Sequence, residues 1–330
     1  MKRRAFLRNC LQNSAGLISL TGIPLLSTTN VPSRKIQIKE KITVKVLGTA
    51  QDGGVPQLGC DCPNCTRARR ESRHKRLIAS LALLEHVSHE AFLVDASPDI
   101  RPQLETILQK GDSPLPASKN PLDGIILTHA HIGHYTGLMF FGYEALSAQK
   151  LPVFCSERMA AFLRDNGPWS QLVRLENIRL RVFSEDREIR LTPRISFQPF
   201  LVPHRDEYSD TVGIKIIGPR KKMLYIPDIQ NWQAWKRDVR KEIQSVDIAL
   251  LDGTFFSAAE LPGRDLSKIG HPFIRSSMDL FEDVIHPKKT QVYFTHLNHS
   301  NPALDPEGPA YKEIESRGFD LATEGQEFTL

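Results

Sequence analysis

Three histidines stand within six residues of one another in the segment THAHIGH, which begins at Thr128. His129, His131 and His134 lie at the end of a strand predicted over residues 124–130. A loop at a strand end can bring such side chains onto one metal ion, because imidazole nitrogen is a good ligand for zinc, iron and manganese. Histidines without a ligand role seldom cluster in this way, so the segment predicts a metal site.

Four further polar side chains each follow an apolar, strand-like segment. They are His204 in FLVPHRDE, Asp228 in MLYIPDIQ, Asp252 in IALLDGTF and His296 in VYFTHLNH. A single histidine or aspartate in such a place is a weak signal. Together the four are the remaining ligands that a metallohydrolase would need.

A second cluster consists of cysteines in the segment CDCPNC. Cys60, Cys62 and Cys65 have the spacing C-x-C-x-x-C, which suits three corners of a tetrahedron around zinc, with the fourth ligand from elsewhere. A redox pair and plain buried thiols are the alternatives. Five cysteines with three of them crowded together do not indicate a disulfide framework.

The elements that must position these residues follow from the hydrophobic pattern. Strands are predicted at 41–49, 78–86, 90–96, 124–130, 151–155, 211–217, 222–227, 247–252 and 291–296, and helices at 98–110, 137–147, 157–165, 233–244, 276–285 and 309–316. Paired strands followed by strands that alternate with helices predict an α/β sandwich with mixed sheets. The polar residues gather at strand ends, where such a fold builds its site.

The composition is that of a globular chain of 330 residues, with a formal net charge of +5. Four of the basic residues lie within residues 1–30, which contain no acid: Lys2, Arg3, Arg4 and Arg8. The rest of the chain is almost neutral, so composition gives no support for nucleic-acid binding. No internal repeat or linker is visible, and a single domain is predicted over 41–330.

The first thirty residues resemble a twin-arginine export signal. The pair Arg3-Arg4 is followed by Phe6-Leu7 and by a modest apolar stretch at 15–26. This stretch is about half the roughly 20 residues that span a bilayer, so no stable membrane span is expected. We therefore expect export to the periplasm by the twin-arginine machinery. A disordered basic tail and a membrane anchor are the alternatives.

The motifs together resemble the metallo-β-lactamase superfamily, whose signature is HxHxDH. The matching residues are THAHIGH followed by His204, Asp228 and His296, with Asp95 before them. Over about residues 42–330 the chain is also similar to the B family of pyrroloquinoline-quinone (PQQ) biosynthesis, through VLGTAQDGGVPQLGCDCPNC, LVDASPDIRPQL, DGTFF and THLNHSNPALD. A further similarity is to the cyclic phosphodiesterase of phosphonate breakdown. The resemblance implies an αββα fold, with two mixed sheets face to face and helices outside.

The resemblance also implies a ligand set. One metal would be held by His129, His131, His204 and Asp228. Asp228 would bridge to a second metal, which would also take His134 and His296. Gly133 stands where the signature has an acid, which leaves that position without a carboxylate. One or two active-site metals are therefore expected, and zinc, manganese and iron all suit the ligands.

Other roles are likewise implied by the resemblance. His271, in IGHPF, matches a histidine that protonates the leaving group in the phosphodiesterases; a loop histidine is the alternative. Asp95 and Asp252 would orient ligand histidines by hydrogen bonds. His299 would complete a structural zinc site with the three cysteines.

The predicted function is hydrolysis of a small anionic substrate, a phosphodiester or related ester, by a metal-bound hydroxide that Asp228 orients. Two alternatives remain. One is an oxidative or accessory protein with a single iron, like the B proteins of PQQ biosynthesis. The other is a non-catalytic carrier of a quinone-like ligand.

Overall fold

The computed structural model describes residues 41–108, 120–285 and 290–330. The described residues belong to one compact unit. The predicted export signal at 1–30 lies outside them. Within the described ranges, no helix has the length and apolar character needed to cross a bilayer.

The first sheet has the strand order β14-β1-β2-β3-β4-β5-β6 within the described ranges. Strands β14, β1, β2 and β3 pair antiparallel, whereas β3, β4, β5 and β6 pair parallel. The strands are β1 (Ile42–Gly48), β2 (Ser80–Glu85), β3 (Glu90–Val94), β4 (Gly124–Ile126), β5 (Leu151–Cys155), β6 (Ile178–Val182) and β14 (Glu327–Thr329).

The second sheet has the order β13-β12-β11-β10-β9-β8-β7 and the same mixed character. Strands β10 to β13 pair parallel, and β7 to β10 pair antiparallel. The strands are β7 (Ile189–Arg190), β8 (Ser196–Leu201), β9 (Val212–Ile217), β10 (Lys222–Ile226), β11 (Ile248–Asp252), β12 (Gln291–Thr295) and β13 (Asp320–Leu321).

The helices are short, and several begin at residues suited to a helix start. Ser156 accepts a hydrogen bond from the backbone N–H of Met159, and Asp238 accepts one from Arg240. The helices are α1 (Pro63–Arg70), α2 (Ile100–Leu108), α3 (Ile132–Tyr135), α4 (Glu157–Asp165), α5 (Trp169–Arg174), α6 (Val239–Gln244), α7 (Ile274–Phe281) and α8 (Pro309–Ser316). Short 3-10 helices occur at Ser72–His74, Thr136–Phe141, Ala258–Glu260, Leu266–Lys268 and Pro302–Leu304.

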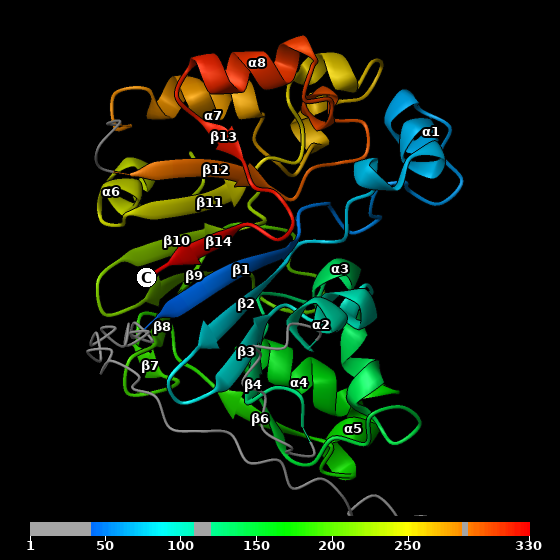
Figure 1. Cartoon of the computed structure of the whole chain (residues 1–330), viewed down its shortest axis with the longest axis vertical. Coiled ribbons are helices and arrows are strands. Elements are labelled where there is room, and N and C mark those ends of the chain that lie inside the picture. The colour runs from blue at the N-terminus through cyan, green and yellow to red at the C-terminus, as the bar shows by residue number, and fades with distance from the viewer. Residues whose placement is uncertain (1–40, 109–119, 286–289) are drawn as a thin grey trace, which may run out of the picture. The chain divides into compact units, whose positions relative to one another are not determined.

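Three apolar clusters define four layers. One cluster lies between the two sheets and includes Leu83 and Leu250. A second, with Met159, joins the first sheet to α2, α4 and α5, and a third, with Met278, joins the second sheet to α6, α7 and α8. Figure 1 shows α7 and α8 beside β11 to β13, and α4 and α5 beside the first sheet. The predicted αββα sandwich with two mixed sheets is confirmed.

Burial on both faces explains the continuous apolar runs of the central strands. Side chains alternate along a strand, so neighbours face different layers. In β11, Ile248 and Leu250 face the other sheet, whereas Ala249 and Leu251 face the helices. A strand covered on both sides needs apolar residues at every position, and IALL supplies them.

Two predicted helices differ from the structure. The helix expected at 137–147 is a 3-10 turn over Thr136–Phe141, after which the chain turns at Gly142 and reaches a positive φ at Ser147. The helix expected at 233–244 begins only at Val239, because Asn231 and two buried tryptophans hold the preceding residues in a bent loop.

Candidate metal centre

The first group of candidate ligands contains His129, His131, His204 and Asp228, whose ligand atoms all lie within 4.8 Å of one another. His129 and His131 follow β4, His204 follows β8, and Asp228 follows β10. Asp228 Oδ2 lies 3.3 Å from His129 Nε2, and Asp228 Oδ1 lies 3.1 Å from His204 Nε2. The structure therefore brings together the four residues predicted for one metal.

Two further groups lie against the first. One contains Asp52, His134 and His296, and the other contains Asp228, His271 and His296. Asp228 Oδ2 is 3.9 Å from His134 Nε2 and 3.8 Å from His296 Nε2. The Asp228 carboxylate thus lies between the two halves of the centre, which is the place a bridging ligand needs. His134 and His296, predicted for the second metal, are also brought together.

Asp95 orients two of these histidines. Its carboxylate lies 2.8 Å from His134 Nδ1 and accepts hydrogen bonds from the backbone N–H and hydroxyl of Thr128. The Thr128 hydroxyl is 3.0 Å from His129 Nδ1. Because that hydroxyl donates its only proton to the carboxylate, His129 Nδ1 must carry the proton and donate it. Both rings therefore keep Nε2 for the metal side.

Asp252 builds the same arrangement in the other sheet. It accepts hydrogen bonds from the backbone N–H and hydroxyl of Thr254, and its Oδ2 lies 2.9 Å from His271 Nδ1. The Thr254 hydroxyl is 3.0 Å from His296 Nδ1. Asp252 therefore reaches the ligand His296 through Thr254, rather than directly.

Asp95 and His296 both have a left-handed backbone, with φ of 64° and 61°. Such a conformation costs a non-glycine residue about 1 kcal/mol or more and persists where the surrounding contacts demand it. Asp95 is fixed by its backbone hydrogen bond to Ile126, and His296 follows β12 directly. The strain is located at the residues that aim ligand side chains into the centre.

Nearby charges and burial shift the pKa values of side chains in the centre in different directions. Burial alone would raise the pKa of Asp228, but the neighbouring His271 and His204 outweigh burial and hold that pKa well below its usual value. Burial lowers the pKa of His129 well below its usual value and also lowers that of His296. The neutral imidazoles of His129 and His296 and the ionised Asp228 carboxylate offer lone pairs that a cation requires.

Two histidines of the centre, His134 and His271, hold a proton more firmly than a free imidazole does. Burial lowers the pKa of His134, but Asp95 and Asp52 outweigh burial and raise it to about 9. Burial likewise opposes the charge of His271, and Asp252 and then Asp228 raise its pKa to about 9. A cation at His134 would displace this proton, because a ligand nitrogen must be free of it.

The donor atoms fit a divalent metal. Among the described residues, His129 Nε2, His134 Nε2, His296 Nε2 and Asp228 Oδ1 are buried without a hydrogen-bond partner. Buried polar atoms of this kind destabilise a fold unless something satisfies them. Three imidazole nitrogens and a carboxylate oxygen that face one another are a donor set for zinc, manganese or iron.

The cysteine cluster forms a separate, compact site. The Sγ atoms of Cys60, Cys62 and Cys65 lie 3.3, 3.5 and 3.6 Å from His299 Nδ1. Zinc bonds of about 2.3 Å to sulfur and about 2.0 Å to nitrogen, at tetrahedral angles, place S and N about 3.5 Å apart. The spacing therefore suits a closed structural zinc, and His299 lies where the resemblance implied it.

This site ties α1 to the segment after β12. Asn64 donates hydrogen bonds to the carbonyls of His299 and Asn301. Arg67 forms an ion pair of 2.8 Å with Asp305. Two stretches that are far apart in the sequence are thereby held together beside the metal centre.

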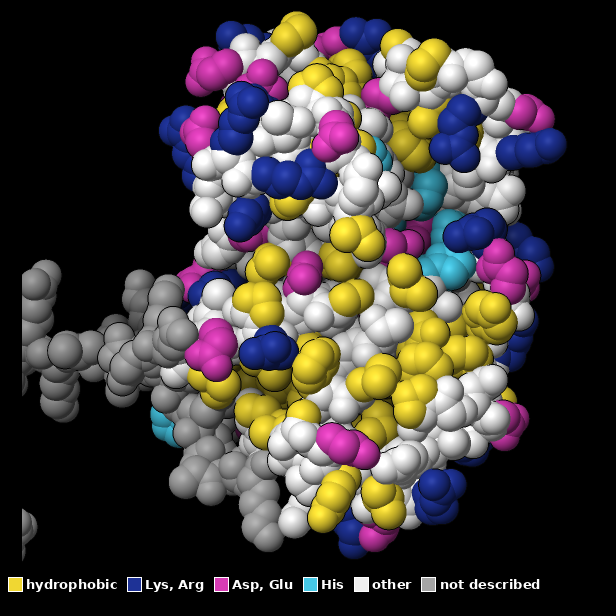
Figure 2. All heavy atoms as spheres, turned by 90° about the vertical axis from the view of Figure 1, so that its right-hand side faces the viewer, with side chains coloured by type: hydrophobic (Ala, Val, Ile, Leu, Met, Phe, Trp, Pro, Cys, Tyr) yellow, Lys and Arg dark blue, Asp and Glu magenta, His cyan; other side chains and the backbone are white. Residues whose placement is uncertain are grey.

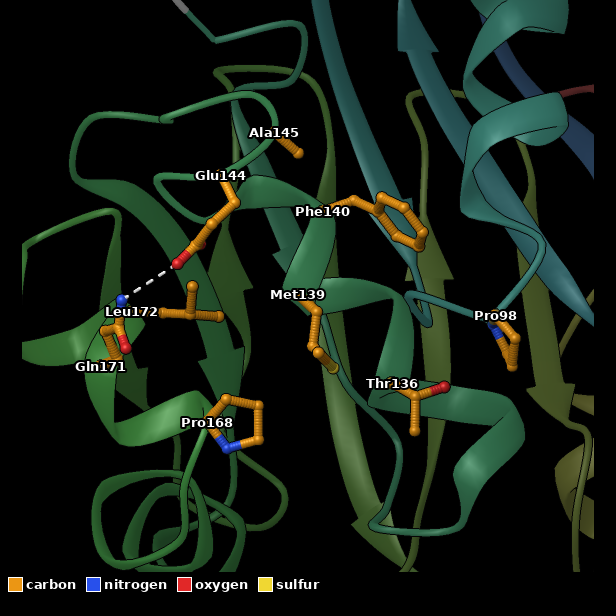
Figure 3. A pocket seen from close by; sticks show the side chains of 9 residues that line it. All are labelled: Pro98, Thr136, Met139, Phe140, Glu144, Ala145, Pro168, Gln171 and Leu172. Atoms are coloured by element: carbon orange, nitrogen blue, oxygen red, sulfur yellow. Dashed lines mark hydrogen bonds between the residues drawn. The ribbon is translucent and has the colours of Figure 1, made fainter.

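Hydrophobic side chains gather next to the opening of the centre. Figure 2 shows histidines within a hollow of the surface, with an apolar face below them. Ile132, Met139 and Tyr143 are among the exposed apolar side chains. A cavity of about 580 Å³ on this side is lined by Pro98, Thr136, Met139, Phe140, Glu144, Ala145, Pro168, Gln171 and Leu172 (Figure 3). None of these lining residues belongs to a group of candidate metal ligands, so the cavity is distinct from the metal centre.

Sequence reasoning missed three residues of the centre. Thr128 and Thr254 carry the hydrogen bonds between carboxylates and ligand histidines. Their signal is a threonine placed directly before a ligand histidine or two residues after a strand-end aspartate. Asp52 lies with His134 and His296 in one ligand group, whereas the motif has Gly133 in place of its expected acid. Its signal is an acid without an assigned role in GTAQDGG, in a chain whose motif has a glycine at position 133 where an acid is expected.

Comparisons with curated proteins give relatives along almost the whole described chain. Coenzyme PQQ synthesis protein B of Cupriavidus necator is 28% identical over 316 residues, which covers 87% of this chain and 99% of the relative. The protein of the same name from Bradyrhizobium diazoefficiens is also 28% identical and covers 88% and 100%.

Solved structures show the same fold. Zinc-bound PqqB of Methylobacterium extorquens superposes with a TM-score of 0.74 at 22% identity, covering 87% of this chain and 100% of that one. A diphosphatase of the PhnP family gives a TM-score of 0.61 at 22% identity, with coverages of 88% and 97%. Yeast PDE1 gives 0.59 at 14% identity, with coverages of 88% and 100%.

A family described as the beta-lactamase superfamily domain matches residues 90–297, which is more than half of the chain. The matched range contains the histidine segment, Asp228 and β12 with His296, and it contains strands of both sheets. With its four layers and its candidate ligands at the strand ends, the chain belongs to the beta-lactamase superfamily and has the metallo-β-lactamase fold.

Proposed function

We propose that this protein is a metal-dependent hydrolase that acts on a phosphodiester or a related ester. The observation that carries the proposal is the position of Asp228, whose carboxylate lies between two groups of buried histidines. This position suits a bridging ligand in a centre that would hold two cations close together, as hydrolases of phosphate esters use.

The residues would hold the metals as follows. His129, His131, His204 and Asp228 would bind one divalent ion, and Asp228, His134 and His296 would contribute to a second. Such an ion lowers the pKa of a water molecule and stabilises negative charge on the reacting ester. Zinc and manganese suit this donor set, and both accept mixed nitrogen and oxygen ligands.

The protein's own side chains supply orientation and a proton. The Asp228 carboxylate accepts a hydrogen bond from the attacking water and so directs a lone pair toward the substrate. His271 donates from Nδ1 to Asp252 Oδ2, which fixes its ring and would leave Nε2 for the leaving group of the substrate. A proton at Nε2 can then be passed to the leaving oxygen. The diphosphatase among the structural relatives supports a phosphate ester as substrate.

Replacing His131 tests the proposal. With bis(p-nitrophenyl) phosphate as probe, His131→Ala should lower turnover by at least about 1000-fold, because charge stabilisation by a bound cation is worth several kcal/mol. His74→Ala, which lies outside the centre beside Glu71, is the matched control and should retain turnover. Full activity in His131→Ala, or no hydrolysis of any phosphodiester by the metal-loaded protein, would contradict the proposal.

A second candidate is a role in PQQ synthesis. It is favoured by the similarity to Coenzyme PQQ synthesis protein B over 87% of this chain. In this case a single iron at the first ligand group, and oxygen uptake rather than ester hydrolysis, would be expected. Restoration of PQQ production in a bacterium that lacks its own B protein would support this candidate, and failure to restore it would count against it.

A further inference from the structure

The second ligand group contains a carboxylate that comes from the opposite end of the chain from His296. Asp52 Oδ1 lies 3.7 Å from His134 Nε2, and the ligand atoms of Asp52, His134 and His296 lie within 4.8 Å of one another. Two ligand atoms that share a metal at about 2.1 Å are roughly 3–4 Å apart. Asp52 therefore lies at ligand distance from a cation held by the two histidines.

The Asp52 carboxylate occupies the space that a side chain at position 133 would need. A Cβ on Gly133 would lie 2.1 Å from Asp52 Oδ1 and 3.0 Å from Asp52 Cα. Gly133 does not have a positive φ, so its backbone does not require glycine. The glycine is required for space, and the space is filled by an acid from another segment.

Asp52 is held in place by a turn and by the chain around His296. The backbone N–H of Gly54 donates to the carbonyl of Gln51, which places Asp52 inside a tight turn. Gln51 donates to the carbonyl of Leu297, and Leu297 donates to that of Thr49. The chain at this turn is thus bonded directly to the residue after His296, which fixes the position of Asp52 relative to His296.

We infer that Asp52 is the carboxylate ligand of the second metal and replaces in space the acid that the motif lacks at Gly133. The inference rests on the metal centre of the proposed function, but not on the reaction or the substrate. The alternative is a structural role, because Asp52 Oδ1 also accepts a hydrogen bond of 3.1 Å from the Gly133 N–H.

Metal content separates the two roles. Asp52→Asn keeps an oxygen that accepts from Gly133 but removes the charge, so a structural role predicts unchanged metal binding. A ligand role predicts that zinc or manganese at the second position is bound more than about 100-fold more weakly, since changes outside the ligand sphere alone cost about 10–100-fold. Metals per chain would be measured by mass spectrometry, and affinity by competition with a chelator.

Moving the acid gives a sharper test. Asp52→Gly should lose the second metal. The double variant Asp52→Gly/Gly133→Asp should regain it, because the carboxylate then comes from position 133; removing the Asp52 side chain relieves the 2.1 Å contact, and the backbone need shift by only a few tenths of an ångström from the remaining 3.0 Å contact with Cα of residue 52. Gly133→Asp alone should lower the melting temperature, because its side chain collides with Asp52. Asp279→Asn, an exposed aspartate on α7 paired with Arg317, is the control and should keep the wild-type metal content.

Two outcomes would overturn the inference: wild-type metal affinity in Asp52→Asn, or a double variant that melts no lower than Asp52→Gly and binds metal no better than it. Neither readout involves substrate. Loss of metal in Asp52→Asn without any phosphodiesterase activity in the wild type would therefore uphold the role of Asp52 while rejecting the proposed reaction.

Discussion

Two threonine hydroxyls decide which nitrogen of a ligand histidine is available. A hydroxyl has one proton and can accept another, so Thr128 and Thr254 each donate to a carboxylate and accept from an imidazole. This arrangement fixes the tautomer of His129 and His296 with Nε2 free. The carboxylates thereby act on these rings through an intermediate group and keep their own negative charge away from the metal.

Removing one hydroxyl tests this chain of hydrogen bonds. Thr254→Val keeps the shape of the buried side chain but removes the bond to His296, so metal affinity should fall by about 10–100-fold. Thr254→Ser keeps the hydroxyl and should retain most of the affinity. Zinc titration in competition with a chelator measures both. Equal affinities in Thr254→Val and the wild type would show that the hydroxyl does not orient the ring.

The candidate ligands could be predicted because their types and positions are local signals. His129, His204 and Asp228 each follow an apolar run, and a polar residue there stands out in the sequence. Asp52 could not be assigned in this way, because its role depends on the absence of a side chain 81 residues later in the chain. Such a relation between two positions exists only after folding.

At the scale of elements, the parallel strands bring the site together. β3 and β4 of one sheet, and β10 and β12 of the other, end just before ligands or their hydrogen-bond partners, and β11 ends at Asp252 itself. These strands were predictable because burial on both faces makes them continuously apolar. Strand β6 was not predicted, although its sequence IRLRV alternates apolar residues with arginines; with only Ile178 buried, this five-residue edge strand lacks the continuous apolar run of the central strands.

Helix α7 should contribute strongly to stability through its buried face. Met278 is fully buried in the cluster between α7 and the second sheet, so Met278→Ala should lower the free energy of unfolding by about 2–5 kcal/mol. Met139 is 48% exposed, and Met139→Ala should change it by less than about 1 kcal/mol. Urea denaturation at equal metal content measures both. Similar losses in the two variants would contradict this view of the core.

At the scale of the whole molecule, the cysteine cluster joins two distant parts of the chain next to the metal centre. His299 is three residues after His296, and the loop with Cys60 continues from the turn that contains Asp52. A cation in the cysteine cluster would therefore hold both sides of the second ligand group. The cluster was predictable from its spacing, but its closeness to the centre was not.

Loss of the cysteine site should increase the mobility of the loop that contains Asp52. Cys62→Ser should lose one zinc per chain, lower the melting temperature by several degrees, and increase amide hydrogen exchange over residues 49–54, because the loop loses its anchor. Cys155→Ala is the control, since Cys155 is buried in β5 and should leave the zinc content unchanged. Unchanged zinc content in Cys62→Ser would contradict the structural site.

The second ligand group and the cysteine cluster each combine residues before β2 with residues after β12, and this sets an order of events during synthesis. A ribosome releases the chain from its N-terminus at about 5–20 residues per second, so Asp52 and Cys60 emerge on the order of tens of seconds before His296 and His299. Until β12 has been made and has joined its sheet, both ligand groups that use these histidines are incomplete. A stalled or truncated chain cannot assemble them, and full metal loading is therefore a property of the finished protein alone.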